Sequence, residues 1–217
     1  MQKIRKGDSM KFLNYDSKLM SFLTNLTDYL LVGLLWLVCS LPIITFGAAT
    51  TAMLYTAAKA IRLGEGNVFP VFFQAFRREF KQATALWLLA IPLLLAVFVN
   101  FSLIMQGDVP KALCFVLLPV MAFILGWIQL WFGYLSHFAD TTKVILSNTF
   151  RMTIGSFLWV LALLVLLAAA VALAMEIIMI AAPLLVLVPG IYAMFADKLL
   201  QKAFQKYLPQ VQEPTEA

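Results

Sequence analysis

The stretch from Tyr29 to Ile61 reads YLLVGLLWLVCSLPIITFGAATTAMLYTAAKAI and is apolar or small at almost every position. A membrane-spanning helix needs about 20 apolar residues, so this stretch is too long for one span and too apolar for a soluble core. Pro42 interrupts it once. We therefore predict two spans, at about 22–41 and 43–61, joined by a tight turn at Pro42. One span followed by a re-entrant segment is the alternative.

The composition extends this conclusion to the whole chain. Hydrophobic residues make up 63% of the 217 residues, charged residues only 12%, and the mean hydropathy is +0.91. A soluble domain is about 45–50% apolar and about 25% charged. The sequence therefore predicts an all-α, polytopic membrane protein. The two cysteines, Cys39 and Cys114, both lie in apolar segments and indicate neither a disulfide framework nor a metal cluster.

Four further apolar segments complete a bundle of about six spans. They lie at about 83–105, 112–135, 155–175 and 177–196. We expect a single membrane-embedded domain over 22–200, a basic N-terminal segment over 1–21 and a polar C-terminal tail over 201–217.

The positive charges indicate the orientation of this bundle. With six spans and a cytoplasmic N-terminus, 15 of the 16 lysines and arginines fall on the cytoplasmic side, and only Lys111 does not. Such an asymmetry follows the positive-inside rule. Both termini are therefore predicted to be cytoplasmic, and the net charge of +5 is attributed to topology rather than to nucleic-acid binding.

An amphipathic pattern lies at about 68–82, before the third span. Its aromatic residues recur at helical spacing, its basic residues point the other way, and Asn67 could cap its N-terminus. Such a helix lies in the membrane interface, where it could simply anchor the chain or could dock a cytoplasmic partner. The candidate contact residues for lipid or partner are Phe72, Phe73, Phe76, Arg77, Arg78, Phe80 and Lys81.

The second span carries a face of small residues. Such faces let membrane helices approach closely. The candidate packing face consists of Gly47, Ala48, Thr51, Ala52 and Ala58.

A few polar residues fall within or beside the spans. Asn25 and Asp28 share a helix face in the first span, and Glu176 lies between the last two. A carboxylate within the bilayer is a candidate functional group because its insertion is costly. In the alternative, neither carboxylate has a functional role: Asp28 lies at the inner membrane interface and Glu176 at an outer turn. His137 and Asp140 are predicted to be solvated loop residues, since one histidine and one carboxylate are too few to bind a metal.

Enzyme signatures are missing from the sequence. It contains no HExxH, no GxSxG, no Walker A motif and no GxGxxG. We expect neither catalytic, metal-binding nor cofactor-binding residues, and no cofactor.

Two segments carry a family resemblance. LLWLVCSLPIITFGAATTAMLY (Leu34–Tyr55) and FFQAFRREFKQATALWLL (Phe72–Leu89) resemble the YesL family of bacterial integral membrane proteins, whose conserved domain has no known function. The resemblance implies a location in the bacterial inner membrane. It also implies genes beside those for carbohydrate ABC transporters and glycan degradation, and supplies no binding residues.

These observations give two functional expectations. The first is a non-catalytic membrane protein, accessory to or regulating carbohydrate uptake or utilisation through a protein partner. The alternative is a small-solute transporter, or a permease-like subunit of a carbohydrate ABC transporter. The expected partners are the lipid bilayer and another membrane protein or ABC transporter component, with no nucleic acid.

Overall fold

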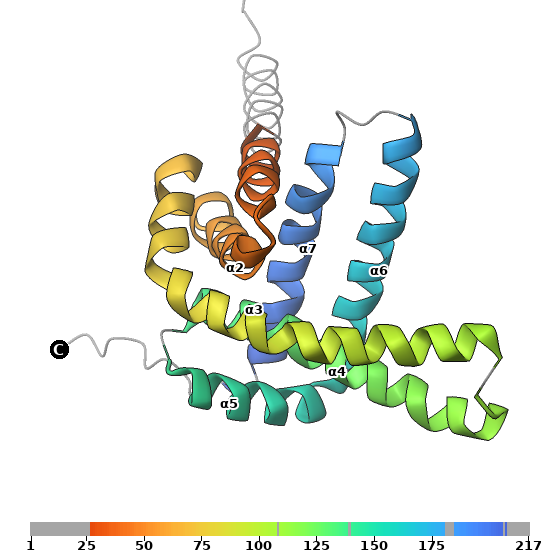
Figure 1. Ribbon diagram of the computed structural model, residues 1–217. Helices are drawn as coiled ribbons and strands as arrows, with labels where there is room; N and C mark the ends of the chain where they lie inside the picture. Colours follow the sequence, from red (N-terminus) through yellow and green to blue (C-terminus); the bar gives the residue numbers. More distant parts are fainter. Residues whose placement is uncertain (1–26, 108, 139, 181–184, 206, 208–217) are drawn as a thin grey trace, which may run out of the picture.

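The computed structural model describes residues 27–205 and 207, except 108, 139 and 181–184. Every regular element in this part of the chain is helical, which confirms the all-α prediction. The first helix covers Thr27–Ser40. It is followed by η1 (Ile43–Thr45), α2 (Phe46–Thr56), η2 (Ala57–Arg62), α3 (Val68–Gln106), α4 (Lys111–His137), α5 (Thr142–Gly155), α6 (Phe157–Ile180) and α7 (Leu187–Phe204) (Figure 1).

Several of these helices suit a membrane. Within the described residues, three helices are long and apolar enough to span a bilayer: Val68–Gln106, Ala112–His137 and Phe157–Ile177. Thr27–Ser40 is apolar but shorter, and residues 22–26 of the predicted first span lie outside the described residues. The chain is therefore a helical membrane protein, whereas the count of six spans stays a prediction.

The turn at Pro42 is held by side-chain hydrogen bonds. The Thr45 hydroxyl lies 2.6 Å from the Cys39 carbonyl oxygen and 2.8 Å from that of Pro42, and both are acceptors within its reach. Across the turn, the indole N–H of Trp36 in the first helix donates to the Thr50 hydroxyl of α2 at 3.2 Å, which ties the two helices together. The Thr45 N–H also donates to the Pro42 carbonyl at 2.9 Å, so Thr45 supplies two donors to the carbonyls of the turn, and the chain reverses within a few residues.

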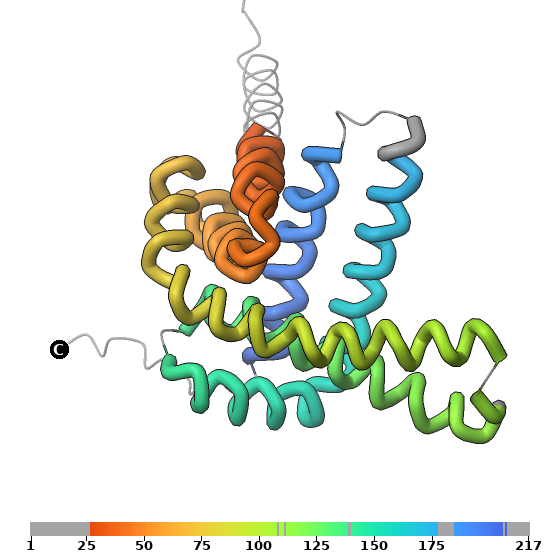
Figure 2. The backbone as a smooth tube through the Cα atoms, viewed as in Figure 1, coloured from red at the N-terminus to blue at the C-terminus, as the bar shows by residue number. Residues whose placement is uncertain are grey.

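The amphipathic segment 68–82 differs from its prediction in two respects. It is the first part of the 39-residue helix α3, not a separate interfacial helix. Its backbone bends before it runs on into the long apolar part (Figure 2). In addition, Phe72 is completely buried in the protein rather than placed among acyl chains. Its ring contacts those of Phe73 and Phe76 on the same helix and belongs to the buried hydrophobic core.

Asn67 also departs from expectation at the start of α3. Its side chain makes no capping hydrogen bond, and only its backbone carbonyl accepts from Val71 N–H at 3.2 Å.

The end of the chain also differs in its boundaries. α6 continues past Glu176 to Ile180, and α7 extends to Phe204, beyond the predicted span end at 196. Nothing between Phe157 and Ile180 breaks a helix, since Pro and Gly are both missing there. The connection between the two helices therefore falls later than the predicted boundary at 176.

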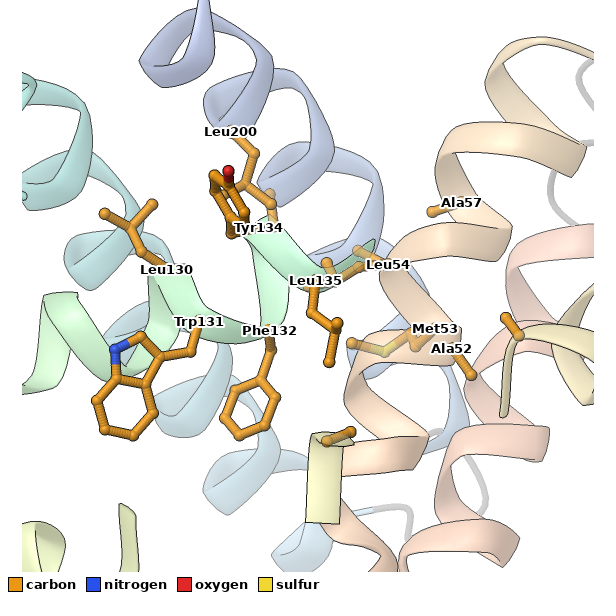
Figure 3. Close-up of a cluster of buried hydrophobic side chains, with 14 of the residues drawn as sticks. Ala52, Met53, Leu54, Ala57, Leu130, Trp131, Phe132, Tyr134, Leu135 and Leu200 are labelled. Carbon is orange, nitrogen blue, oxygen red and sulfur yellow. The ribbon is translucent and has the colours of Figure 1, made fainter. Parts of the chain in front are cut away.

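α4 passes through the centre of the molecule. Figure 3 shows Leu135 of α4 pointing toward Met53 and Leu54 of α2, while Trp131 points to the other side. All four side chains are at most 2% exposed. The α3–α4 pair extends across the ends of α6 and α7, and α5 lies along α4 (Figure 1). This arrangement brings the ends of η2, α4 and α7 together.

Candidate functional site

A buried carboxylate lies where η2, α4 and α7 meet. Asp197, on α7 and one residue past the predicted span 177–196, is only 2% exposed. Its Oδ2 accepts a hydrogen bond from Arg62 Nε at 2.7 Å and another from Gln201 Nε2 at 2.8 Å. Arg62 is the last residue of η2, and Gln201 lies one turn further along α7. The carboxylate thus links two segments that are 135 residues apart in sequence.

The only histidine of the chain completes this ionic cluster. His137 ends α4, its side chain is 17% exposed, and its Nε2 lies 3.4 Å from Asp197 Oδ1. Within the described residues, neither of these two buried atoms has a hydrogen-bond partner. The cluster of Arg62, His137, Asp197 and Gln201 therefore joins three helical elements.

The other ring nitrogen restricts the protonation of His137. Nδ1 lies 3.0 Å from the Gly133 carbonyl oxygen and 2.9 Å from Ser136 Oγ. The Ser136 hydroxyl can donate its single proton to the Gly133 carbonyl at 2.7 Å. A carbonyl only accepts, so this geometry favours a proton on Nδ1. Nε2 then carries a proton toward Asp197 only when the ring is an imidazolium.

The charge of Asp197 follows from its neighbours. Burial raises the pKa of Asp197, but the interactions with His137 and Arg62 lower it by more, so this pKa lies below its ordinary value. The carboxylate is therefore ionised at neutral pH, opposite one permanent and one conditional positive charge.

A second polar group lies beside the cluster. The Tyr134 hydroxyl donates to Asp140 Oδ2 at 2.6 Å and accepts from Asn148 Nδ2 at 3.0 Å, which joins α4 to α5. The Asp140 backbone carbonyl also accepts from Gln82 Nε2 of α3. The prediction of solvated loop residues was correct only in placing Asp140 in a loop, between α4 and α5. His137 belongs to α4, and both side chains bond to groups on packed helices instead of to solvent alone.

The predicted intramembrane polar residues do not form a common site in the structure. Asn25 lies outside the described residues. Asp28 is half-buried in the first turn of helix Thr27–Ser40, and Glu176 is exposed near the end of α6. No hydrogen bond or ion pair joins these two carboxylates in the described part of the chain.

The predicted packing face lies in the interior. Gly47, Ala48, Thr51 and Ala52 are buried on α2, and Ala58 is buried in η2. A Cβ at Gly47 would come within 2.6 Å of the Ala83 carbonyl oxygen and 2.9 Å of Phe132 Cε1. Glycine is therefore needed where α2 meets α3 and α4.

The basic residues of α3 divide into two kinds. Arg78 donates to Glu79 and lies over the Tyr55 ring, 4.8 Å from its centroid. Arg77 and Lys81 are exposed and make no ion pair within the described residues. The aromatic residues beneath them form a row of ring contacts through Phe69, Phe73, Phe72, Phe76 and Phe80. We call Arg77 and Lys81 the basic face of α3.

Sequence reasoning missed the centre of the ionic cluster and one close helix contact. A lone carboxylate in the apolar segment IYAMFADKLL, with Gln201 four residues later, was the available signal for Asp197. Gly33 and Gly190 were missed as a pair: a Cβ at Gly33 would overlap the Val186 carbonyl oxygen, and one at Gly190 that of Tyr29. Nothing in the sequence shows that these two glycines meet.

The cluster consists of groups that form ion pairs and hydrogen bonds. In the described residues, no group of three or more histidine, cysteine, aspartate or glutamate side chains is placed to hold a metal ion. One carboxylate, one imidazole and one guanidinium can hold charge and exchange a proton, and they can fix helices against one another.

Comparison with known proteins gives one match. Residues 29–101 match the family described as "Protein of unknown function, DUF624". YesL-type proteins carry this domain, so the match supports the resemblance at the level of the domain. No curated protein and no solved structure matches the chain. The matched segment supplies Arg62 and the basic face of α3, whereas His137 and Asp197 lie outside it.

Proposed function

We propose that this chain is a non-catalytic, multi-pass protein of the bacterial cell membrane that assists or regulates carbohydrate uptake or utilisation by binding a protein partner. Both termini are placed in the cytoplasm in this proposal. The observation that carries the proposal is the basic face of α3.

This face has the properties of a docking surface. Arg77 and Lys81 are exposed and leave their charges unpaired, while the opposite side of the same helix, one to two turns earlier, is packed into the protein through Phe72. A helix fixed in this way presents two cations at constant spacing, and preorganised charges steer an acidic partner and set its orientation. Arg78 contributes less to docking because Glu79 neutralises its charge.

The link to carbohydrate rests on the resemblance to the YesL family. The transporter alternative needs a polar path through the spans, and the two carboxylates that would line it, Asp28 and Glu176, share no contact. We therefore favour the accessory role.

The test compares two double charge reversals. Arg77→Glu with Lys81→Glu reverses the basic face, and Lys143→Glu with Arg151→Glu makes the same change on α5, where both residues are exposed. The first pair is expected to abolish co-purification of a carbohydrate ABC transporter component in gentle detergent and to impair growth on glycans. The α5 pair is expected to preserve both. Equal behaviour of the two variants would refute the docking role of α3.

For the alternative, Asp28→Asn with Glu176→Gln is the informative variant. Loss of glycan uptake in this variant, with co-purification intact, would favour the transporter reading.

A further inference from the structure

An interhelical cleft of about 540 Å³ lies between the first helix, α2, α3, α4, α6 and α7. Its volume is that of a pocket for one small molecule, roughly 300–1,000 Å³. Val171 of α6 lines it and is 56% exposed, so the cleft opens on a face of α6 that is otherwise apolar. In a helix of this hydropathy, that face lies against lipid.

The walls offer an occupant almost nothing to hydrogen-bond. Trp36 and Trp87 both line the cleft, but their indole N–H groups are already used, by Thr50 Oγ1 at 3.2 Å and by the Ile43 carbonyl at 2.7 Å. The Thr50 hydroxyl in turn donates to the Phe46 carbonyl at 2.8 Å. The indoles therefore present only their ring surfaces to the cleft.

The polar residues of the wall are satisfied in a similar way. Gln129 Nε2 lies 2.7 Å from the Tyr192 hydroxyl and 3.2 Å from the Leu163 carbonyl, both of which accept from it. Gln129 Oε1 has no partner among the described residues, but the atom is enclosed by the protein. It thus presents no acceptor to a molecule in the cleft. The Tyr192 hydroxyl accepts from Gln129 and keeps one proton to donate, so it is the single polar group that these residues leave to an occupant. An occupant of these walls must therefore be apolar along nearly all its length.

The size of the cleft argues against a helix. One turn of an α-helix, about 10–12 Å across and 5.4 Å long, fills at least about 400 Å³. The cleft would therefore hold little more than a single turn, too short for the transmembrane segment of a partner or of a second copy. A thin, flexible chain fits this volume better.

We propose that the cleft binds one acyl chain of a membrane phospholipid. The chain enters beside Val171 and lies against the rings of Trp36, Trp87 and Phe132, while the headgroup stays outside the cleft. The proposal does not depend on the proposed partner function, since none of the lining residues belongs to the basic face of α3.

The test places a large side chain in the cleft by a substitution on α6, and a substitution at the neighbouring residue of the same helix is the matched control. Ala170 lines the cleft, whereas its neighbour Ala169 is exposed and does not. Native mass spectrometry after delipidation is expected to find one retained phospholipid on the wild-type protein and on Ala169→Phe, and none on Ala170→Phe. Brominated acyl chains are expected to quench tryptophan emission less in Ala170→Phe than in the control.

A second variant that fills the cleft distinguishes loss of the binding site from misfolding. Ala174→Phe also projects into the cleft, and it should lose the lipid while it unfolds at the same temperature as Ala169→Phe. Retention of the phospholipid by both filling variants would overturn the proposal. It would also be overturned by a wild-type dimer that Ala170→Phe converts to a monomer, because a second copy would then cover the cleft.

Discussion

Arg62 and Asp197 form an ion pair, with Nε 2.7 Å from Oδ2, that fastens the end of η2 to α7. The two partners are unequally buried: the Arg62 side chain is 35% exposed and that of Asp197 only 3%. The consequence of removing one partner therefore depends on which charge stays behind.

This asymmetry gives an ordered prediction for two variants. Arg62→Ala leaves a buried carboxylate with fewer partners, so it should cost more than Asp197→Asn, after which Arg62 can turn to solvent. Breaking a buried pair costs roughly 3–5 kcal/mol. We expect Arg62→Ala at the low end of that range or below, because the exposed arginine is partly screened, and Asp197→Asn nearer to about 1 kcal/mol. Thermal unfolding in detergent at pH 7 measures both, and the reverse order would show that Asp197 is not held by Arg62.

The pKa of Asp197 predicts a loss of stability in acid. Because this pKa is lower in the folded protein than the ordinary value of 3.8, the carboxylate stabilises the fold at pH values above 3.8. The stabilisation is lost as the pH falls below 3.8 and passes through the folded pKa. Unfolding temperatures between pH 7 and pH 3 should therefore fall more steeply for the wild type than for Asp197→Asn. Parallel curves for the two proteins would contradict the assignment.

His137 predicts a separate effect on the contact between α4 and α7. Its Nδ1 lies 3.0 Å from the Gly133 carbonyl oxygen and its Nε2 lies 3.4 Å from Asp197 Oδ1, so the ring joins the end of α4 to α7. In His137→Ala this link is removed, and amide hydrogen exchange over 193–204 should become faster than in the wild type at the same pH. Unchanged exchange would show that His137 does not hold α7.

The sequence predicts the helical membrane class well because hydrophobicity and helix length are local properties. Pro42 marks a real turn, and Thr45 supplies the hydrogen bonds that close it. The ionic cluster is different: Arg62, His137 and Asp197 are separated by long stretches of sequence, and only the packing of α4 between α2 and α7 brings them together. The burial of Phe72 was likewise not predictable from local sequence. Its periodicity predicts an apolar helix face, but periodicity cannot distinguish a face toward lipid from one toward another helix, and in the folded chain Phe72 belongs to the buried core.

Gly47 offers a direct test of that packing. A methyl group there would come within 2.8 Å of Trp87 Cβ, in addition to the contacts with Ala83 and Phe132, so Gly47→Ala must push α2 away from α3 and α4. Overpacking of this kind costs about 1–3 kcal/mol, and thermal unfolding should show the loss. Ala85→Val is the matched control, since Ala85 is exposed on α3 and can accept added carbon without a clash. Because Trp87 and Phe132 lie against Gly47, their rings should become more accessible in Gly47→Ala and not in the control. A variant at Gly47 with wild-type stability would mean that the two helices do not depend on this close contact.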